Sequence, residues 1–126
     1  MTMPADASDV GHLPRIGALL GVWAHPDDEA YLSSGLMSRV RNHGGRVVVV
    51  TATRGDAGRF RGIRPGEPGH PGAETLGELR LSELRAAAAA LGVRQLSLLD
   101  YPDGRLDTVD PREAIASLVR HLRHGR

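Results

Sequence analysis

The chain has 126 residues and no cysteine, and its 16 basic and 15 acidic side chains leave a net charge of +1. This length predicts one domain, the lack of cysteine excludes disulfides and thiolate metal sites, and the small charge argues against a nucleic-acid partner. Residues 1–9 lack the pattern of a signal peptide. The longest apolar run, Ile16–Ala24, is about half the length of a membrane span. We therefore expect a cytoplasmic protein with no membrane span.

The first third of the chain predicts a leader, a strand and a helix. Residues 1–14 are polar and indicate a mobile leader, so the domain is expected to span residues 15–126. The apolar run Ile16–Trp23 is typical of a strand buried on both faces of a sheet. The acidic string Asp27–Glu29 suits the first turn of a helix, which Gly44 should end. The apolar residues of that helix recur at helical spacing: Leu32, Leu36, Met37 and Val40.

Alternation of strand and helix continues to the end of the chain. Arg46–Thr53 holds four consecutive valines and predicts a buried strand, and Thr53–Thr75 is a long Gly-, Pro- and Arg-rich loop. Leu76–Leu91 predicts a helix, Gln95–Leu99 a third strand, and Asp110 caps a last helix. The core-facing positions expected on these two helices are Leu76, Leu79, Leu84, Leu91, Ile115, Leu118, Val119 and Leu122.

This order of elements predicts parallel strands joined by helical crossovers, which is a doubly wound α/β sheet. Ligands bind outside the carboxyl ends of the strands in such sheets. Three polar segments follow the three predicted strands: His25–Glu29, Thr53–Gly58 and Asp100–Gly104. Their coincidence is the main argument from the sequence for a functional site.

The segment that follows the first strand has the residue types of a metal site. A neutral imidazole and a carboxylate are ordinary zinc ligands, although they also suit other divalent ions. His25 is followed by Pro26, which stiffens the turn, and by two adjacent carboxylates, Asp27 and Asp28. One carboxylate can bind the metal while the other acts as general base towards its water. Helix capping would explain one acidic residue, but it does not require the histidine.

The string Ala24–Glu29 resembles the signature of the PIG-L/LmbE-like de-N-acetylases, which include N-acetylglucosaminyl-phosphatidylinositol de-N-acetylase and the deacetylases of mycothiol and bacillithiol synthesis. Thr51–Gly58 is similar to the second-strand loop of that family, and Tyr101–Leu106 is similar to its third-strand exit. The resemblance covers about residues 16–122 and implies a Rossmann-like fold. The intervening helix matches the family pattern at Arg80, Glu83, Ala87, Leu91 and Gly92.

The resemblance implies a zinc-dependent removal of the N-acetyl group from N-acetylglucosamine-type sugar conjugates. His25 and Asp28 match the first two zinc ligands, and Asp27 matches the general base. The positions that match substrate contacts are Arg80, Asp103 and Asp56.

One part of the family pattern is missing from this sequence. The family takes its third zinc ligand from a His-x-x-His motif after a fourth strand, so the resemblance implies a fold truncated after the third helix. The first strand would then be an open edge through which copies of the chain could associate. His121 and His124 have His-x-x-His spacing but belong to a basic helix end, and His70 lies in the long loop, so none is expected to replace the missing ligand.

Two alternatives remain open from the sequence. The chain could be an inactive remnant of the family that serves as a binding or interaction module. A nucleotide-binding module is the weaker alternative, because neither Gly-x-Gly-x-x-Gly nor a phosphate-loop lysine is present.

Overall fold

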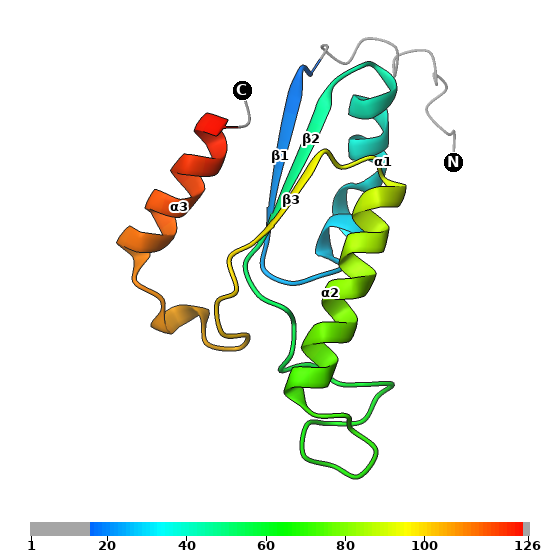
Figure 1. The fold of residues 1–126 in the computed structure, drawn as a ribbon, viewed down its shortest axis with the longest axis vertical. Helices are drawn as coiled ribbons and strands as arrows, with labels where there is room; N and C mark the ends of the chain where they lie inside the picture. Colours follow the sequence, from blue (N-terminus) through cyan, green and yellow to red (C-terminus); the bar gives the residue numbers. More distant parts are fainter. Residues whose placement is uncertain (1–15, 125–126) are drawn as a thin grey trace, which may run out of the picture.

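The computed structural model describes residues 16–124 and has three strands and three α-helices within that range (Figure 1). In chain order the elements are β1 (Ala18–Trp23), α1 (Asp28–Asn42), β2 (Arg46–Thr51), α2 (Ala73–Ala90), β3 (Gln95–Leu98), the short 3₁₀ helix η2 (Leu106–Thr108) and α3 (Pro111–His124). The predicted order is confirmed, and each predicted boundary lies within three residues of the observed one. The leader predicted for residues 1–14 lies outside the described residues.

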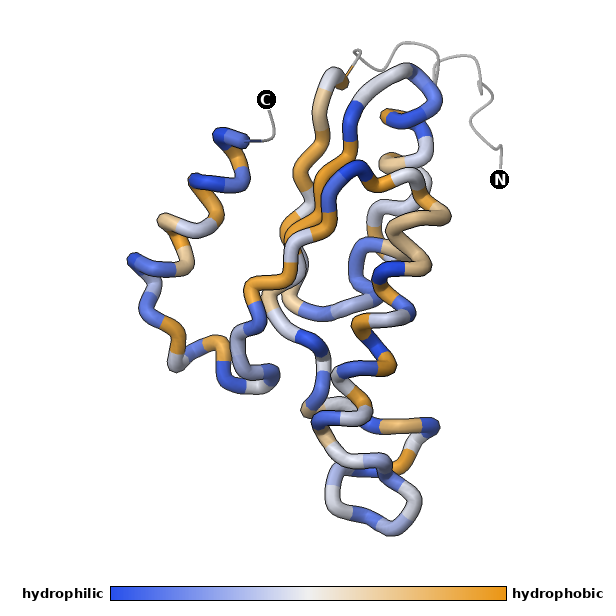
Figure 2. The backbone as a smooth tube through the Cα atoms, viewed as in Figure 1, coloured by the Kyte–Doolittle hydropathy of each residue, from blue (hydrophilic) through white to orange (hydrophobic). Residues whose placement is uncertain are grey.

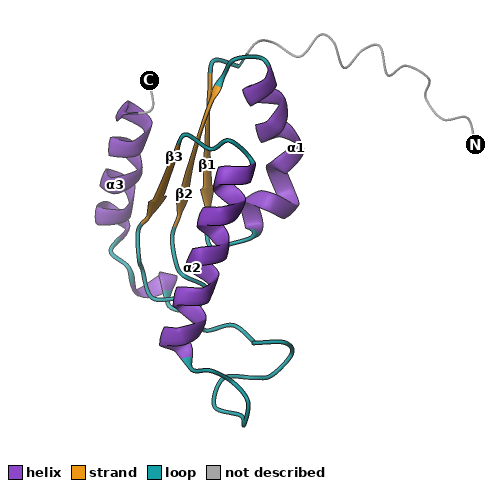
Figure 3. Cartoon of the chain, turned by 45° about the vertical axis from the view of Figure 1, so that its right-hand side comes forward, coloured by secondary structure: helices purple, strands orange, loops and turns teal. Residues whose placement is uncertain are grey.

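The three strands form one parallel sheet in the order β1-β2-β3. Ala18 pairs with Arg46 at the start of β2, and Val48 pairs with Gln95 at the start of β3. Helices α1 and α2 lie on one face of this sheet and α3 lies on the other, in both views of the chain (Figures 1 and 3). The α/β prediction, with three layers and a parallel sheet, is therefore confirmed.

The core lies between the sheet and the helices α1 and α2. Val47, Val49 and Val50 of the central strand β2 are fully buried, because this strand has a neighbour on each side. Met37 and Val40 of α1 pack with Val47 and Val49 in the main hydrophobic cluster. Helix α2 adds a second set of buried side chains: Leu76, Leu81, Leu84 and Ala88.

Burial of β1 on both faces, predicted from its apolar run, is wrong. The Val22 side chain is 46% exposed, because β1 is an edge strand and, within residues 16–124, just one of its faces packs closely on a helix. In Figure 2 the hydrophobic colour concentrates on the strands, whereas α3 alternates between apolar and polar residues along its length. Five apolar residues whose helical spacing suggested a buried face are exposed instead: Leu32, Leu36, Leu79, Ile115 and Leu122.

The predicted ends of the helices are confirmed in detail. Gly44 follows α1 with φ 82°, a conformation that favours glycine, and its N–H donates to the carbonyl of Arg41 at 3.0 Å. Asp110 caps α3, because its Oδ1 accepts a hydrogen bond from the N–H of Arg112 at 2.9 Å. None of the described helices is both long enough and apolar enough to cross a bilayer.

Candidate active site

Backbone hydrogen bonds bring the three predicted segments together at the carboxyl edge of the sheet. The N–H of Ala52 donates to the carbonyl of Trp23 at 2.8 Å, and the N–H of Tyr101 donates to the carbonyl of Ala52 at 2.9 Å. The Thr53 hydroxyl donates to the carbonyl of Ala24 at 2.9 Å. The segments that follow β1, β2 and β3 are thus tied to one another just beyond the strands, as the sequence predicted.

His25 and Asp28 approach each other within the turn between β1 and α1. The backbone N–H of His25 donates to Oδ2 of Asp28 at 3.1 Å, and Nδ1 of the imidazole lies 3.6 Å from the same oxygen. Two ligands bound to one tetrahedral zinc ion at about 2.0–2.2 Å are roughly 3.3–3.6 Å apart. The separation of these two atoms therefore fits a shared cation.

Asp27 has an unusual backbone conformation for an aspartate. Its φ of 85° and ψ of −26° lie in the left-handed region, which costs free energy for a residue with a Cβ. Asp27 occupies the N-cap position of α1, yet its side chain makes no capping hydrogen bond. The carboxylate instead faces the guanidinium of Arg80, with Oδ2 3.5 Å from Nη2. Helix capping therefore does not explain this carboxylate.

Arg80 of α2 links the first two segments from the side. Its Nη1 donates to the carbonyl of Gly55 at 2.8 Å, and its Nη2 donates to the carbonyl of Pro26 at 3.0 Å. The guanidinium lies so close to Gly55 that a Cβ there would collide with it, and the φ of 67° at Gly55 also favours glycine. A single side chain thus holds the turn containing Asp27 against the loop that follows β2.

Asp103 lies on the other side of the imidazole. Its Oδ1 is 3.0 Å from Nε2 of His25, and its Oδ2 accepts a hydrogen bond from the N–H of Ala57 at 2.9 Å. The Asp103 side chain is only 7% exposed. Sequence reasoning did not foresee this contact, because 78 positions separate Asp103 from His25 and only the folded sheet edge brings them together.

These side chains surround an open cavity of about 520 Å³. Tyr31, in the first half of α1, also lines the cavity with a side chain that is 87% exposed. Nothing in the helical spacing of Tyr31 marks it as a site residue, because its position depends on where α1 begins. The predicted site residues that line this cavity are His25, Asp27, Asp28, Arg80 and Asp103.

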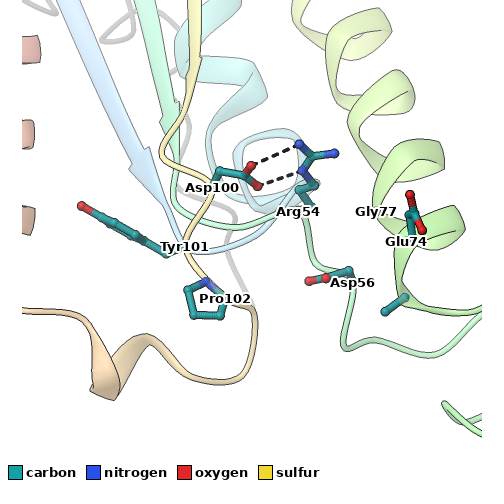
Figure 4. A pocket seen from close by; sticks show the side chains of 8 residues that line it. Arg54, Asp56, Glu74, Gly77, Asp100, Tyr101 and Pro102 are labelled. Carbon is teal, nitrogen blue, oxygen red and sulfur yellow. Dashed lines mark hydrogen bonds and ion pairs between the residues drawn. The ribbon is translucent and has the colours of Figure 1, made fainter.

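A second, smaller pocket of about 330 Å³ lies on the α2 side of the loop that follows β2 (Figure 4). Asp56 lines this pocket and is not among the residues that line the cavity of His25. Arg54 pairs with Asp100 through two contacts, Nε to Oδ1 at 2.8 Å and Nη2 to Oδ2 at 3.1 Å. The Arg54 guanidinium therefore lowers the pKa of the Asp100 carboxyl below its ordinary value.

Glu29 is a buried carboxyl beside the candidate ligands. It lies in the first turn of α1, is 1% exposed, and neither of its side-chain oxygens has a hydrogen-bond partner among the described residues. Burial raises its pKa above the ordinary value, and the nearby charges of Asp27 and Asp28 act in the same direction.

The other histidines do not complete a metal site within residues 16–124. No group of three His, Cys, Asp or Glu side chains in that range is arranged to hold an ion. Both ring nitrogens of His70 have hydrogen-bond partners, the carbonyl of Gly58 and the N–H of Gly72. His121 contacts the carbonyl of Ser117, and the C-terminal end of α3 lies at the opposite end of the sheet from the loops of the site (Figure 1). The described residues therefore supply two candidate ligands for an ion, without a third.

Comparison with known proteins identifies the family of the chain. Residues 20–126 match the family described as PIG-L, GlcNAc-PI de-N-acetylase. The chain belongs to the PIG-L family. The segment 51–58 after β2 and the segment 101–106 after β3, which the resemblance rested on, both lie within the matched range.

Two bacterial relatives of the PIG-L chain are described as 1D-myo-inositol 2-acetamido-2-deoxy-alpha-D-glucopyranoside deacetylases. The protein of Kineococcus radiotolerans is 39% identical over 101 residues, which cover 80% of this chain and 27% of the relative. The protein of Thermobispora bispora is 44% identical over 127 residues, which cover 86% of this chain and 41% of the relative. The chain thus spans between about a quarter and two fifths of the length of these relatives.

Two solved structures resemble this PIG-L chain equally well in fold. The N,N'-diacetylchitobiose deacetylase of Pyrococcus horikoshii has a TM-score of 0.73 and 26% identity, and the match covers 86% of this chain and 37% of that one. The 4-carboxy-2-hydroxymuconate hydratase GalB of Pseudomonas putida also has a TM-score of 0.73, with 21% identity over 87% of this chain and 44% of that one. The second likeness concerns the fold alone, so the fold by itself does not identify the reaction.

Proposed function

We propose that the chain carries the metal-binding and water-activating residues of a zinc-dependent deacetylase that acts on N-acetylglucosamine-type sugar conjugates. The observation that carries this proposal is the 3.6 Å approach of His25 Nδ1 to Asp28 Oδ2, with the carboxylate of Asp27 lining the same cavity. The descriptions of the Kineococcus radiotolerans relative and of the Pyrococcus horikoshii structure support the substrate class, because each names an N-acetylated amino sugar or its derivative.

His25 and Asp28 would hold the cation, through one imidazole nitrogen and one carboxylate oxygen. This pair suits zinc and also other divalent ions. A bound divalent cation lowers the pKa of water and polarises a carbonyl oxygen. Water molecules or further protein ligands would complete its coordination.

Asp27 would act as the general base. Its carboxylate accepts a proton from the attacking water, whose oxygen forms a bond to the carbonyl carbon of the acetyl group. The carbon–nitrogen bond then breaks, the proton passes to the leaving nitrogen, and the products are acetate and the free amino sugar. The contact between Asp27 and Arg80 keeps this carboxylate facing the cavity.

Arg80 is the substrate contact that the cavity supports best. It lines the cavity beside Asp27, and three of its five N–H groups are used by the carbonyls of Gly55 and Pro26 and by the carboxylate of Asp27. The remaining donors suit sugar hydroxyls. Asp56 lines the neighbouring pocket, so it would contact only a part of the conjugate that extends past the loop following β2.

A second candidate function is a binding module without catalytic activity. It is favoured by one observation: residues 16–124 bring together two metal-ligating side chains rather than three. Two protein ligands should hold zinc more weakly than the three of ordinary catalytic sites.

One experiment separates the two candidates. The full chain is dialysed with zinc, its zinc content is measured by elemental analysis, and acetate release is measured with N-acetylglucosaminyl-inositol and N,N'-diacetylchitobiose. The deacetylase proposal requires retained zinc and acetate release that is lost in Asp27→Asn. Equal release by the variant and the parent would exclude Asp27 as base, and zinc-free, inactive protein that still binds the sugars would favour the binding module.

A further inference from the structure

Asp103 contacts the imidazole of His25 at the edge of the cavity that both residues line. Both of its oxygens have partners within the protein: Oδ1 lies 3.0 Å from Nε2 of His25, and Oδ2 accepts from the N–H of Ala57 at 2.9 Å. Because the side chain is 7% exposed, little of it is accessible to a ligand in the cavity.

The contact determines which imidazole nitrogen is available to a metal. A carboxylate can only accept hydrogen bonds, so the nitrogen that faces it, Nε2, must carry the proton. In the neutral ring Nδ1 then has a free lone pair, and this is the nitrogen that lies 3.6 Å from Oδ2 of Asp28. A carboxylate behind a ligating imidazole orients the ring and increases its basicity.

The backbone of Ala57 fixes the position of Asp103 in turn. Ala57 lies in the loop that follows β2, and the Arg80 guanidinium also binds this loop through the carbonyl of Gly55. The segments after all three strands therefore contribute to the orientation of one imidazole.

From this geometry we propose that Asp103 is a positioning residue, which fixes the Nε2–H tautomer of His25 and directs Nδ1 towards a cation shared with Asp28. The inference about the cation rests on the function proposed above, whereas the tautomer does not depend on any metal or substrate. The resemblance to the PIG-L family predicts instead that Asp103 contacts the sugar, and the two roles give different experimental results.

The first measurement uses the unmodified chain without metal. Long-range ¹H–¹⁵N spectra of the imidazole rings distinguish protonated from unprotonated nitrogens, and a chain of 13.5 kDa is small enough for these spectra. At a pH where the ring is neutral, we expect His25 to have a protonated Nε2 and a bare Nδ1. A protonated Nδ1 would overturn the proposal.

The second measurement compares metal binding in Asp103→Asn with that in the parent, by competition with a chromophoric chelator for Zn²⁺ and by the visible spectrum of Co²⁺. Loss of a carboxylate behind a ligating histidine typically weakens metal affinity about 10- to 100-fold. We expect a loss of this size, a changed Co²⁺ spectrum, and a mixture of tautomers at His25. Unchanged metal affinity and tautomer, together with weaker sugar binding, would assign Asp103 to the substrate and overturn the proposal.

Asp107→Asn is the matched control, because Asp107 lies in η2 four residues further along, is exposed, and should change neither measurement. Failure of the deacetylase proposal can be recognised separately. In that case the tautomer and its loss in Asp103→Asn would persist, while acetate release would be absent from every variant.

Discussion

Asp28 contacts His25 twice through a single oxygen, since Oδ2 accepts the backbone N–H of His25 and also lies 3.6 Å from the imidazole Nδ1. The turn thereby holds both potential ligands in place before any ion arrives. Preorganisation of this kind reduces the cost of assembling a site.

His25→Ala should therefore reduce metal affinity without unfolding the protein. The imidazole is one of the two candidate ligands that residues 16–124 bring together, and it lies at an open cavity, outside the hydrophobic core. We expect the dissociation constant for Zn²⁺ to rise about tenfold or more, which corresponds to about 1.4 kcal/mol. His43→Ala is the control, since His43 is exposed, lies outside the cavity and bonds through Nδ1 to the carbonyl of Arg39. Equal affinities in the two variants would exclude His25 from the proposed metal site.

Asp27→Asn should abolish most of the proposed deacetylase activity while it leaves stability unchanged. Asparagine adopts positive φ as readily as aspartate does, so the φ of 85° is retained, but its amide cannot accept the proton of water. We expect acetate release to fall about 10²- to 10⁴-fold, with the melting temperature unaltered. A parallel loss of melting temperature would mean instead that the carboxylate is needed for folding.

Arg80→Lys should loosen the contact between the turn of Asp27 and the loop after β2. Lysine keeps the charge, but its single side-chain nitrogen cannot replace the two guanidinium nitrogens that bind the carbonyls of Gly55 and Pro26. We expect the free energy of unfolding, measured with urea, to fall by about 1.5–3 kcal/mol, the usual contribution of a hydrogen bond that involves a charged group. Arg85→Lys on the exposed face of α2 should change it much less.

The pair of Arg54 and Asp100 predicts a stability difference that depends on pH. The pKa of Asp100 is lowered in the folded protein, so its contribution is present above the pKa of the unfolded chain and is lost as the pH falls through the folded value. Asp100→Asn should therefore melt slightly below the parent at pH 7 and together with it in strong acid. The effect should be small, because the pair is largely exposed. A gap that widens on acidification would contradict this assignment.

Val22→Lys tests the predicted association of the chain through its sheet edge. Val22 lies on β1, which pairs only with β2 in the described part of the chain, and its side chain is 46% exposed. We expect the parent to show concentration-dependent association in sedimentation experiments, and the lysine to reduce it by placing charge on the edge strand. Identical sedimentation of the variant and the parent would exclude this edge.

The helices, the strands and the sheet edge that carries the site could be predicted from the sequence, because all of them depend on local signals. Gly44 and the capping Asp110 mark helix ends within a few residues, and the valine run of β2 has no plausible alternative to a buried strand. The carboxyl-end rule then placed the three polar segments together without any knowledge of distances.

Local signals in the sequence could not predict which side chains are buried or which distant residues are in contact. Leu32 and Leu36 share the helical spacing of Met37, but the direction in which α1 crosses the sheet decides which of them meets a strand. The contact of Asp103 with His25 likewise depends on how the segments after two non-adjacent strands bend towards each other. Periodicity contains no information about either arrangement.

The central position of β2 has a consequence for amide hydrogen exchange. Its backbone is hydrogen-bonded to a neighbour on each side, and the loop that follows it bonds to the segments after β1 and β3 through Ala52. Deuterium should enter this strand last, since its amides open only when the sheet separates. The residues around His25 are thus anchored to the slowest-exchanging part of the molecule, whereas α3, with only Ser117 buried, can fray without disturbing them.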